Sequence, residues 1–135
     1  MHEEVTVPIA QDRDIVTARQ RGRAMAAKVG FSSTDQISIA TAISELSRNI
    51  VEYAHEGEIV ISLVRAHENG QAGIQIIARD TGPGIANVSL AMKDGYSTSR
   101  SLGLGLPGTK RLMDEFEIDS KPGKGTRVTI RKWLR

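Results

Sequence analysis

Cysteine is absent from the 135-residue sequence, which excludes disulfide bonds, thiol catalysis and cysteine-based metal sites. The three histidines stand far apart along the chain, at positions 2, 55 and 67, and do not form a zinc-binding pattern. No apolar run is long enough to cross a bilayer, and the first residues lack the features of a signal peptide. We therefore expect a cytoplasmic protein that has no membrane partner.

Aromatic residues make up only 4% of the chain, so the core is expected to be aliphatic and stacking platforms for nucleic-acid bases are few. The net charge is only +2, but its distribution is uneven. Residues 1–70 hold 7 Lys/Arg against 10 Asp/Glu, and residues 71–135 hold 11 against 6. A basic C-terminal half suits nucleic acid or the phosphates of a nucleotide equally well. The shortage of aromatics favours the nucleotide, and we predict no nucleic-acid partner.

The length and an ordinary globular composition predict one domain over residues 1–135. Alternating apolar residues predict a strand over 3–9. Apolar residues at three- and four-residue spacing predict a helix over about 12–28. The run Ser33–Gln36 has the pattern of a capping box, which predicts that a second helix begins there and continues to about Ala54.

The rest of the chain alternates between β-rich segments and turns or glycine-rich connections. The expected elements are strands over 58–66 and 73–79, a short helix near 87–93, a helix over 106–113, and strands near 115–120 and 126–133. Together they predict an α+β fold, a two-layer sandwich with helices on one face of a mixed, mostly antiparallel sheet. The glycine-punctuated stretch 81–105 is long for so small a domain, which indicates a functional segment rather than a simple connection.

Glu45 and Asn49 form the first candidate cluster. They are four residues apart on the second predicted helix and share one face, at the flank of its apolar stripe. An Asn oxygen suits Mg²⁺, a hard cation, and a nearby carboxylate can accept a proton from an attacking hydroxyl. The alternative is a solvated shoulder of the helix, because exposed Glu and Asn are common.

Asp80, Gly82 and Gly84 form the second cluster, directly after a β-rich run. An ionised Asp only accepts hydrogen bonds, so it can bind the exocyclic amine of adenine. Glycines let the backbone approach a flat ring closely. The alternative is a plain turn, in which Asp, Gly and Pro are the usual residues.

The third cluster is the glycine-rich run 103–108, which leads into a predicted helix. Amides at a helix N-terminus that follow glycines can bind an anion such as phosphate. The spacing matches neither a P-loop nor a Rossmann fingerprint, so the run by itself is a weak signal. The candidate phosphate contacts are Gly103, Gly105, Leu106, Gly108 and Lys110.

The order of these clusters resembles the GHKL (histidine-kinase-like) superfamily of ATPases. The first cluster is similar to its N box, the second to its first glycine box, and the glycines Gly103 and Gly105 to its second. Thr126, which follows a Gly-Lys-Gly turn, matches a family threonine near the adenine and its bound water. The resemblance covers essentially the whole chain and implies ATP and Mg²⁺ as cofactors.

Within the superfamily the chain resembles the stand-alone serine kinases of bacterial partner-switching systems. No dimerisation helices with a phosphorylatable histidine precede the domain, and residues 41–50, 103–108, 110–116 and 132–135 look like those kinases. The resemblance implies phosphorylation of serine or threonine on STAS-domain proteins (RsbS- and RsbR-like) in a stressosome. It also implies that the released kinase binds and activates a PP2C-type phosphatase (RsbU-like).

The resemblance also implies roles for single residues. Asn49 would hold the metal, Glu45 would accept the proton of the substrate hydroxyl, and Asp80 would bind adenine. Arg100 departs from the family, because it stands where a small residue is expected; it is either a contact for the γ-phosphate or an exposed loop arginine.

Two other functions stay open at this stage. One is an anti-sigma factor with the same kinase fold. The other is a non-catalytic binding module, in which ATP only stabilises a shape that partners recognise. An intact Glu45 argues against the binding module, because a protein that only binds needs no general base.

Overall fold

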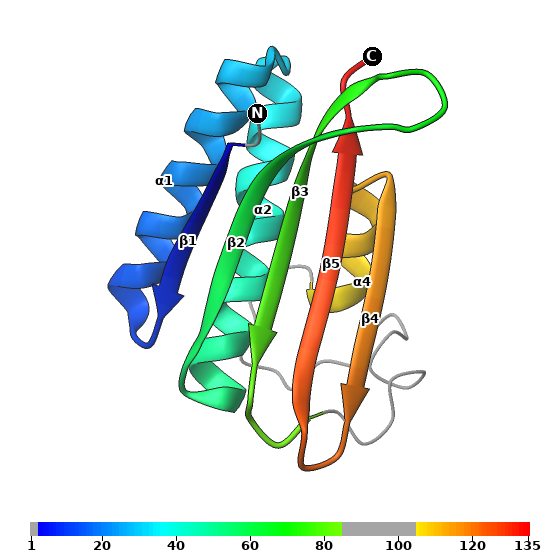
Figure 1. Ribbon diagram of the computed structural model, residues 1–135. Helices are drawn as coiled ribbons and strands as arrows, with labels where there is room; N and C mark the ends of the chain where they lie inside the picture. Colours follow the sequence, from blue (N-terminus) through cyan, green and yellow to red (C-terminus); the bar gives the residue numbers. More distant parts are fainter. Residues whose placement is uncertain (1–2, 85–104) are drawn as a thin grey trace.

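A computed structural model describes residues 3–84 and 105–135, and it contains one sheet with helices on one face (Figure 1). Along the chain the described elements are β1 (Glu4–Ile9), α1 (Asp12–Val29), α2 (Ser33–Asn49), η1 (Ile50–Ala54), β2 (Gly57–Arg65), β3 (Ala72–Asp80), α4 (Gly105–Leu112), β4 (Glu115–Lys121) and β5 (Gly125–Trp133). The strand order is β1-β2-β3-β5-β4, and each of the four pairings is antiparallel. The expected α+β sandwich is therefore confirmed, with an antiparallel sheet in the described residues. None of the described helices is both long and apolar enough to cross a membrane.

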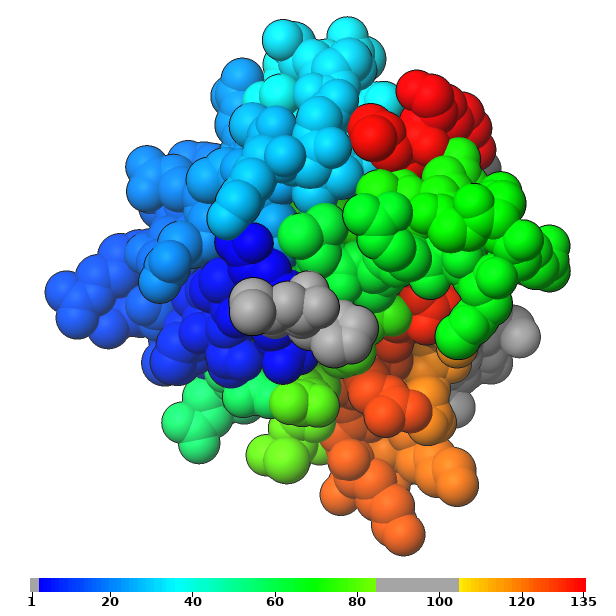
Figure 2. Space-filling view, turned by 45° about the horizontal axis from the view of Figure 1, so that its top comes forward, coloured from blue at the N-terminus to red at the C-terminus, as the bar shows by residue number. Residues whose placement is uncertain are grey.

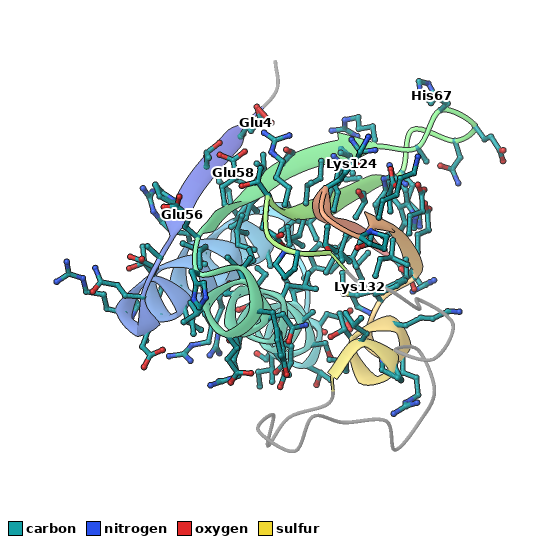
Figure 3. All side chains as sticks on the ribbon, turned by 90° about the horizontal axis from the view of Figure 1, so that it is seen from below. Glu4, Glu56, Glu58, His67, Lys124 and Lys132 are labelled. Carbon is teal, nitrogen blue, oxygen red and sulfur yellow. The ribbon has the colours of Figure 1, made fainter. Side chains whose placement is uncertain are left out.

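The core lies between the sheet and the helices, and it is aliphatic as expected. Side chains alternate between the two faces of a strand, so every second residue of β2, β3 and β5 points toward the helices. The most buried of these are Ile59, Ile61, Ile74, Ile76, Val128 and Ile130. Seen from below, the sheet and the helices form two separate layers (Figure 3).

Helices α1 and α2 pack closely because a glycine of α1 faces α2. Gly22 is buried in α1, and a Cβ atom there would overlap the end of the Ile43 side chain on α2. Helix α1 ends at Gly30, which has a left-handed φ of 111° and whose N–H donates to the carbonyl groups of Ala26 and Ala27. This is the C-terminal cap that glycine favours.

Helix α2 begins one residue earlier than the expected capping box. The N-cap is Ser32, whose hydroxyl accepts the backbone N–H of Asp35 at 3.2 Å. Gln36 donates its side-chain amide to the carbonyl oxygen of Phe31 at 2.9 Å instead of closing a box with Ser33. Ser32 and Ser33 are adjacent and chemically equivalent as caps, so the sequence pattern alone did not separate the two positions.

At its C-terminal end α2 changes its winding and continues as η1, a π-helix. The N–H of His55 donates to the carbonyl oxygen of Ile50 at 2.8 Å, a bond that spans five residues. His55 then takes a left-handed φ of 72° and ends the helix. The expected end near Ala54 is confirmed, but the wider turn was not predicted. Single π-turns in helices are frequently found at functional sites.

The face of the sheet away from the helices carries charged side chains that pair across the strands. Figure 2 shows the N-terminal, central and C-terminal segments side by side on one side of the molecule. The ion pairs join Arg79 to Glu58, Arg131 to Glu115 and Glu117, and Arg127 to Asp119. Cross-strand pairs of opposite charge stabilise a sheet modestly and keep this face polar.

The C-terminal end of β5 fastens α4 to the sheet. Asp114 accepts the backbone N–H of Trp133 at 2.8 Å and a guanidinium N–H of Arg135 at 3.0 Å. Lys132, whose side chain is largely buried, donates to the carbonyl oxygen of Leu112, the last residue of α4, at 3.0 Å (Figure 3). These contacts fix the C-terminal end of the helix, so its N-terminal end points toward the opposite end of the sheet (Figure 1).

Candidate functional site

The candidate residues converge at one end of the sheet. The last turn of α2, the π-helix η1, the end of β3 and the turn between β4 and β5 all lie there (Figure 1). The N-terminal end of α4 points to the same end. Segments that are far apart in the sequence, around positions 50, 80, 105 and 125, therefore form one neighbourhood.

Glu45 is buried, with 6% of its surface exposed, and belongs to the inner face of α2. Asn49, the last residue of α2, is half-buried and lies one turn further along the same face. A solvated helix shoulder is therefore excluded for Glu45. Because a carboxylate is seldom buried without a partner or a function, the burial of Glu45 is compatible with a structural contact as well as with a catalytic role.

Asp80 is the last residue of β3, and its side chain is held by the loop that follows. Its Oδ1 atom accepts the backbone N–H of Gly82 at 2.9 Å. Thr126 lies directly opposite Asp80 on β5. An acceptor and a hydroxyl thus lie next to each other on the face that points toward the helices.

The glycines of the second cluster are required by close backbone contacts. A Cβ atom at Gly82 would lie 2.6 Å from the Cβ of Ala54 in η1. A Cβ atom at Gly84 would overlap the carbonyl oxygen of Lys121, and Gly84 also has a left-handed φ of 76°. The segment is therefore wedged between η1 and the β4–β5 turn, where side chains would force it away from both.

Two further glycines flank Asp80; the sequence analysis used Gly125 only as part of the Gly-Lys-Gly turn before Thr126, and it missed Gly57. Gly125 has a φ of 86°, and a Cβ atom there would overlap the carbonyl oxygen of Asp80. A Cβ atom at Gly57, the partner of Asp80 on β2, would lie 3.0 Å from the Cβ of Asp80. Each of these glycines stands at the start of a strand, and this position can be interpreted only when the pairing register of the strands is known.

The third cluster is described in part. Gly105 begins α4 with a left-handed φ of 64°, and its carbonyl oxygen accepts the hydroxyl of Thr109 at 2.9 Å. Gly108 is buried and Lys110 is exposed. The side chain of Leu106 packs into the core, so only its backbone is available to a ligand. Gly103, Arg100 and the short helix expected near 87–93 lie outside the described residues.

The donor set fits ATP and a hard cation better than a protein-bound metal centre. Within residues 3–84 and 105–135 no group of three or more His, Cys, Asp or Glu side chains could hold a metal ion. A cation at Asn49 would need ligands from elsewhere, and Mg²⁺ in nucleotide sites takes them from phosphates and water. Glycine-lined backbone beside an acceptor carboxylate suits a flat base with an amine.

Comparison with known proteins shows which family this chain belongs to. The family described as "Histidine kinase-, DNA gyrase B-, and HSP90-like ATPase" matches residues 34–135. The chain is 51% identical over all 135 residues to "Serine/threonine-protein kinase RsbT" of Bacillus subtilis (strain 168), and the match covers 100% of both chains.

More distant relatives point to the same group. The chain is 34% identical over 121 residues to "Anti-sigma F factor" of Caldanaerobacter subterraneus subsp. tengcongensis, covering 87% of this chain and 83% of that protein. The fold is similar to the crystal structure of the RsbU and RsbW domains of Rv1364c from Mycobacterium tuberculosis, with a TM-score of 0.62 and 25% identity. That match covers 100% of this chain and 32% of the larger one. The family expected from the order of the clusters is confirmed.

Proposed function

Because this chain belongs to the family of histidine kinase-, DNA gyrase B- and HSP90-like ATPases, we propose that it transfers the γ-phosphoryl group of ATP to a serine or threonine of a STAS-domain partner. Its enzyme class is that of a serine/threonine-protein kinase. One observation carries the catalytic part of the proposal: Glu45 is buried and lies one helical turn before Asn49, at the end of the sheet where Asp80 and the glycines converge.

In this proposal Asn49 and Glu45 act on the phosphoryl group and the attacking hydroxyl. The side-chain oxygen of Asn49 would hold Mg²⁺, which in nucleotide sites takes its other ligands from phosphates and water. Glu45 accepts the proton of the substrate hydroxyl as the new O–P bond forms. When bound, the Mg²⁺ neutralises phosphate charge, and phosphoryl transfer depends mainly on such neutralisation and on positioning.

The other residues position the nucleotide. Asp80 accepts the adenine amine, Thr126 lies beside the base, and Gly82 and Gly84 let the backbone approach it. The N-terminus of α4 faces the phosphates with backbone amides that have no partner inside the helix. Gly103, Gly105, Gly108, the backbone of Leu106, and the side chains of Lys110 and Arg100 complete the proposed phosphate contacts.

The proposed partners are those of a partner-switching system. The chain phosphorylates RsbS- and RsbR-like STAS proteins of a stressosome and, once released, binds and activates an RsbU-like PP2C-type phosphatase. Full-length similarity to the kinase RsbT supports this, and so does a related structure in which an RsbU domain and an RsbW domain share one chain. The proposed phosphoryl donor is ATP, and the proposed location of the reaction is the cytoplasm.

An anti-sigma factor is the second candidate, because several relatives carry that name. Identity to those proteins is 29–34% over part of the chain, against 51% over its full length for the kinase. The higher and more complete match favours the STAS-directed kinase.

Transfer of radiolabelled phosphate from ATP tests the function directly. The wild-type chain is expected to label a STAS protein, and Glu45→Gln is expected to reduce the rate about 10²–10⁴-fold while nucleotide still binds. Asn49→Ala should in addition lose the Mg²⁺-dependent part of ATP affinity. Glu68→Gln, a change of an exposed residue in the β2–β3 turn, is the matched control. A Glu45→Gln protein that labels its partner at the wild-type rate would refute the mechanism.

A further inference from the structure

Three polar residues form a row across the site end of the sheet. Thr126 on β5 is paired with Asp80 on one side and with Ser120 on the other. Their strand neighbours Ala78, Val128 and Ile118 pack with the core, so all three side chains point toward the helices. Neither the sequence patterns nor the family resemblance singled out Ser120.

Ser120 and Thr126 are in direct hydrogen-bond contact. Their hydroxyl oxygens lie 2.8 Å apart, and either can be the donor. The Ser120 hydroxyl also lies 3.2 Å from the carbonyl oxygen of Gly125, which it can donate to. Gly125 in turn packs against the backbone of Asp80, so Ser120 is connected to Asp80 through both Thr126 and Gly125.

The chemistry of purine bases gives this row a use. Adenine presents an amine, which donates, next to ring nitrogen N1, which accepts. Guanine presents a carbonyl oxygen, which accepts, next to N1–H, which donates. A carboxylate only accepts, so Asp80 suits the adenine amine, and the neighbouring atom of the base then requires a donor.

We propose that Ser120 is a positioning residue that holds the Thr126 hydroxyl beside Asp80 and thereby contributes to the preference for adenine over guanine. The inference rests on the proposed nucleotide site. With adenine bound, the single Ser120 proton turns from the carbonyl oxygen of Gly125 to the hydroxyl oxygen of Thr126, and Thr126 donates to N1 directly or through a water molecule. Threonine has more than one accessible χ1 rotamer, and the contact with Ser120 selects one of them.

Loss of the Ser120 hydroxyl should therefore affect the two purines differently. Ser120→Ala is expected to weaken ATP binding about 2- to 10-fold, the range that a single hydrogen bond spans. Binding of GTP, which does not use a donor at that position, should change by less than 2-fold. Ser120→Thr keeps the hydroxyl and suits a strand, so it should retain most of the wild-type preference.

Competition of ATP and GTP against a fluorescent ATP analogue measures the preference. Ser62→Ala is the matched control, since Ser62 lies on the opposite face of the sheet and its hydroxyl bonds to Glu4. In a Thr126→Val protein, Ser120→Ala should have no further effect on the ATP:GTP ratio. A purely structural role would lower the affinities for ATP and GTP equally, and that outcome would overturn the inference.

The same titrations separate this inference from the nucleotide site itself. If Asp80→Asn loses ATP affinity while Ser120→Ala leaves the ATP:GTP ratio unchanged, the nucleotide site stands and the role of Ser120 is refuted. If Asp80→Asn binds ATP as the wild type does, the site assignment fails and the inference fails with it.

Discussion

Asp80 and Thr126 are directly paired residues of β3 and β5, although 46 positions of sequence separate them. The loop after β3 fixes the carboxylate, and β4 supplies a hydroxyl next to the threonine. Strand register therefore brings together an acceptor and a potential donor at one edge of the proposed base site. The arrangement makes the recognition of adenine open to direct tests.

Asp80→Asn is expected to weaken ATP binding at least several-fold. An amide presents both a donor and an acceptor, and a mismatched buried polar group costs about 1–3 kcal/mol. Titration of a fluorescent ATP analogue measures the change. Asp119→Asn, on the exposed face of β4, is the control and should bind as the wild type does. Equal affinities for folded Asp80→Asn and wild type would remove Asp80 from the site.

Gly84→Ala should be far more damaging than Gly70→Ala. Both glycines have a left-handed φ, 76° and 67°, so each substitution carries a backbone strain of about 1–2 kcal/mol. Only at Gly84 would the new Cβ atom also overlap a carbonyl oxygen, that of Lys121, whereas nothing lies within 4 Å at Gly70. We expect Gly84→Ala to lose nucleotide affinity at least 10-fold and Gly70→Ala to keep it. Thermal melts and nucleotide titrations compare the two variants. Equal melting temperatures and equal nucleotide affinities for Gly84→Ala and Gly70→Ala would contradict the packing argument.

Acid should weaken the attachment of α4 through Asp114. Burial raises the pKa of this carboxyl, but the Trp133 N–H and the Arg135 guanidinium outweigh burial and hold the pKa below its ordinary value of 3.8. Hydrogen bonds from Trp133 and Arg131 likewise hold the pKa of Glu115 below its ordinary value of 4.5.

The pKa of each carboxylate is lower in the folded state than in the unfolded state. Each carboxylate therefore stabilises the fold at a pH above its unfolded-state pKa, and this stabilisation is lost as the pH falls through the folded-state pKa. Asp114→Asn should lower the unfolding midpoint at pH 7, and the difference from the wild type should shrink as the pH falls below about 4. Urea titrations followed by circular dichroism at pH 7 and pH 3.5 measure both values. If the difference in unfolding midpoint between Asp114→Asn and the wild type were larger at pH 3.5 than at pH 7, the prediction would be wrong.

Partner exchange gives a prediction at the level of the whole protein. Phosphorylation gives a STAS serine a charge of about −1.5 to −2. The carboxylate of Glu45 repels this charge, so the phosphorylated protein should dissociate. The chain should bind the unmodified STAS protein tightly, bind a serine-to-aspartate variant weakly, and bind STAS protein and phosphatase in competition. Pull-downs with each partner and with a sigma factor distinguish the cases. Retention of the sigma factor alone would favour the anti-sigma function, and joint retention of STAS protein and phosphatase would exclude a shared surface.

The fold could be predicted well because local patterns and tertiary structure agree. The alternation in β1 and the three- and four-residue spacing in α1 gave these elements nearly their observed bounds. The start of α2 was misplaced by one residue because two adjacent serines are equally good caps. The π-helix η1 was missed, since a single wider turn leaves the apolar pattern of the sequence almost unchanged.

The sequence led to candidate site residues where they belong to a short motif of neighbouring residues. Glu45 and Asn49 share a helix, and Asp80 and Gly82 share a loop, so their spacing was informative. Ser120 was not singled out, because its nearness to Asp80 depends on the register of three strands, which a single sequence does not specify. Leu106 stays a predicted contact through its backbone amide, and the packing of its side chain in the core was not predicted, because a glycine-rich motif specifies backbone position and not side-chain direction.

The length of the connection that contains η1 also affects which side chains of β2 point toward the core. Seven residues lie between Asn49 and Gly57, and β2 begins immediately afterwards with Ile59 and Ile61 pointing inward. A one-residue deletion in this connector has two possible consequences. The wide turn can tighten to an α-helical turn and leave β2 in place, or β2 can slip by one residue and exchange its inner and outer side chains. If the wide turn tightens, the extra residue of η1 absorbs a one-residue deletion, and the same side chains of β2 still point toward the core.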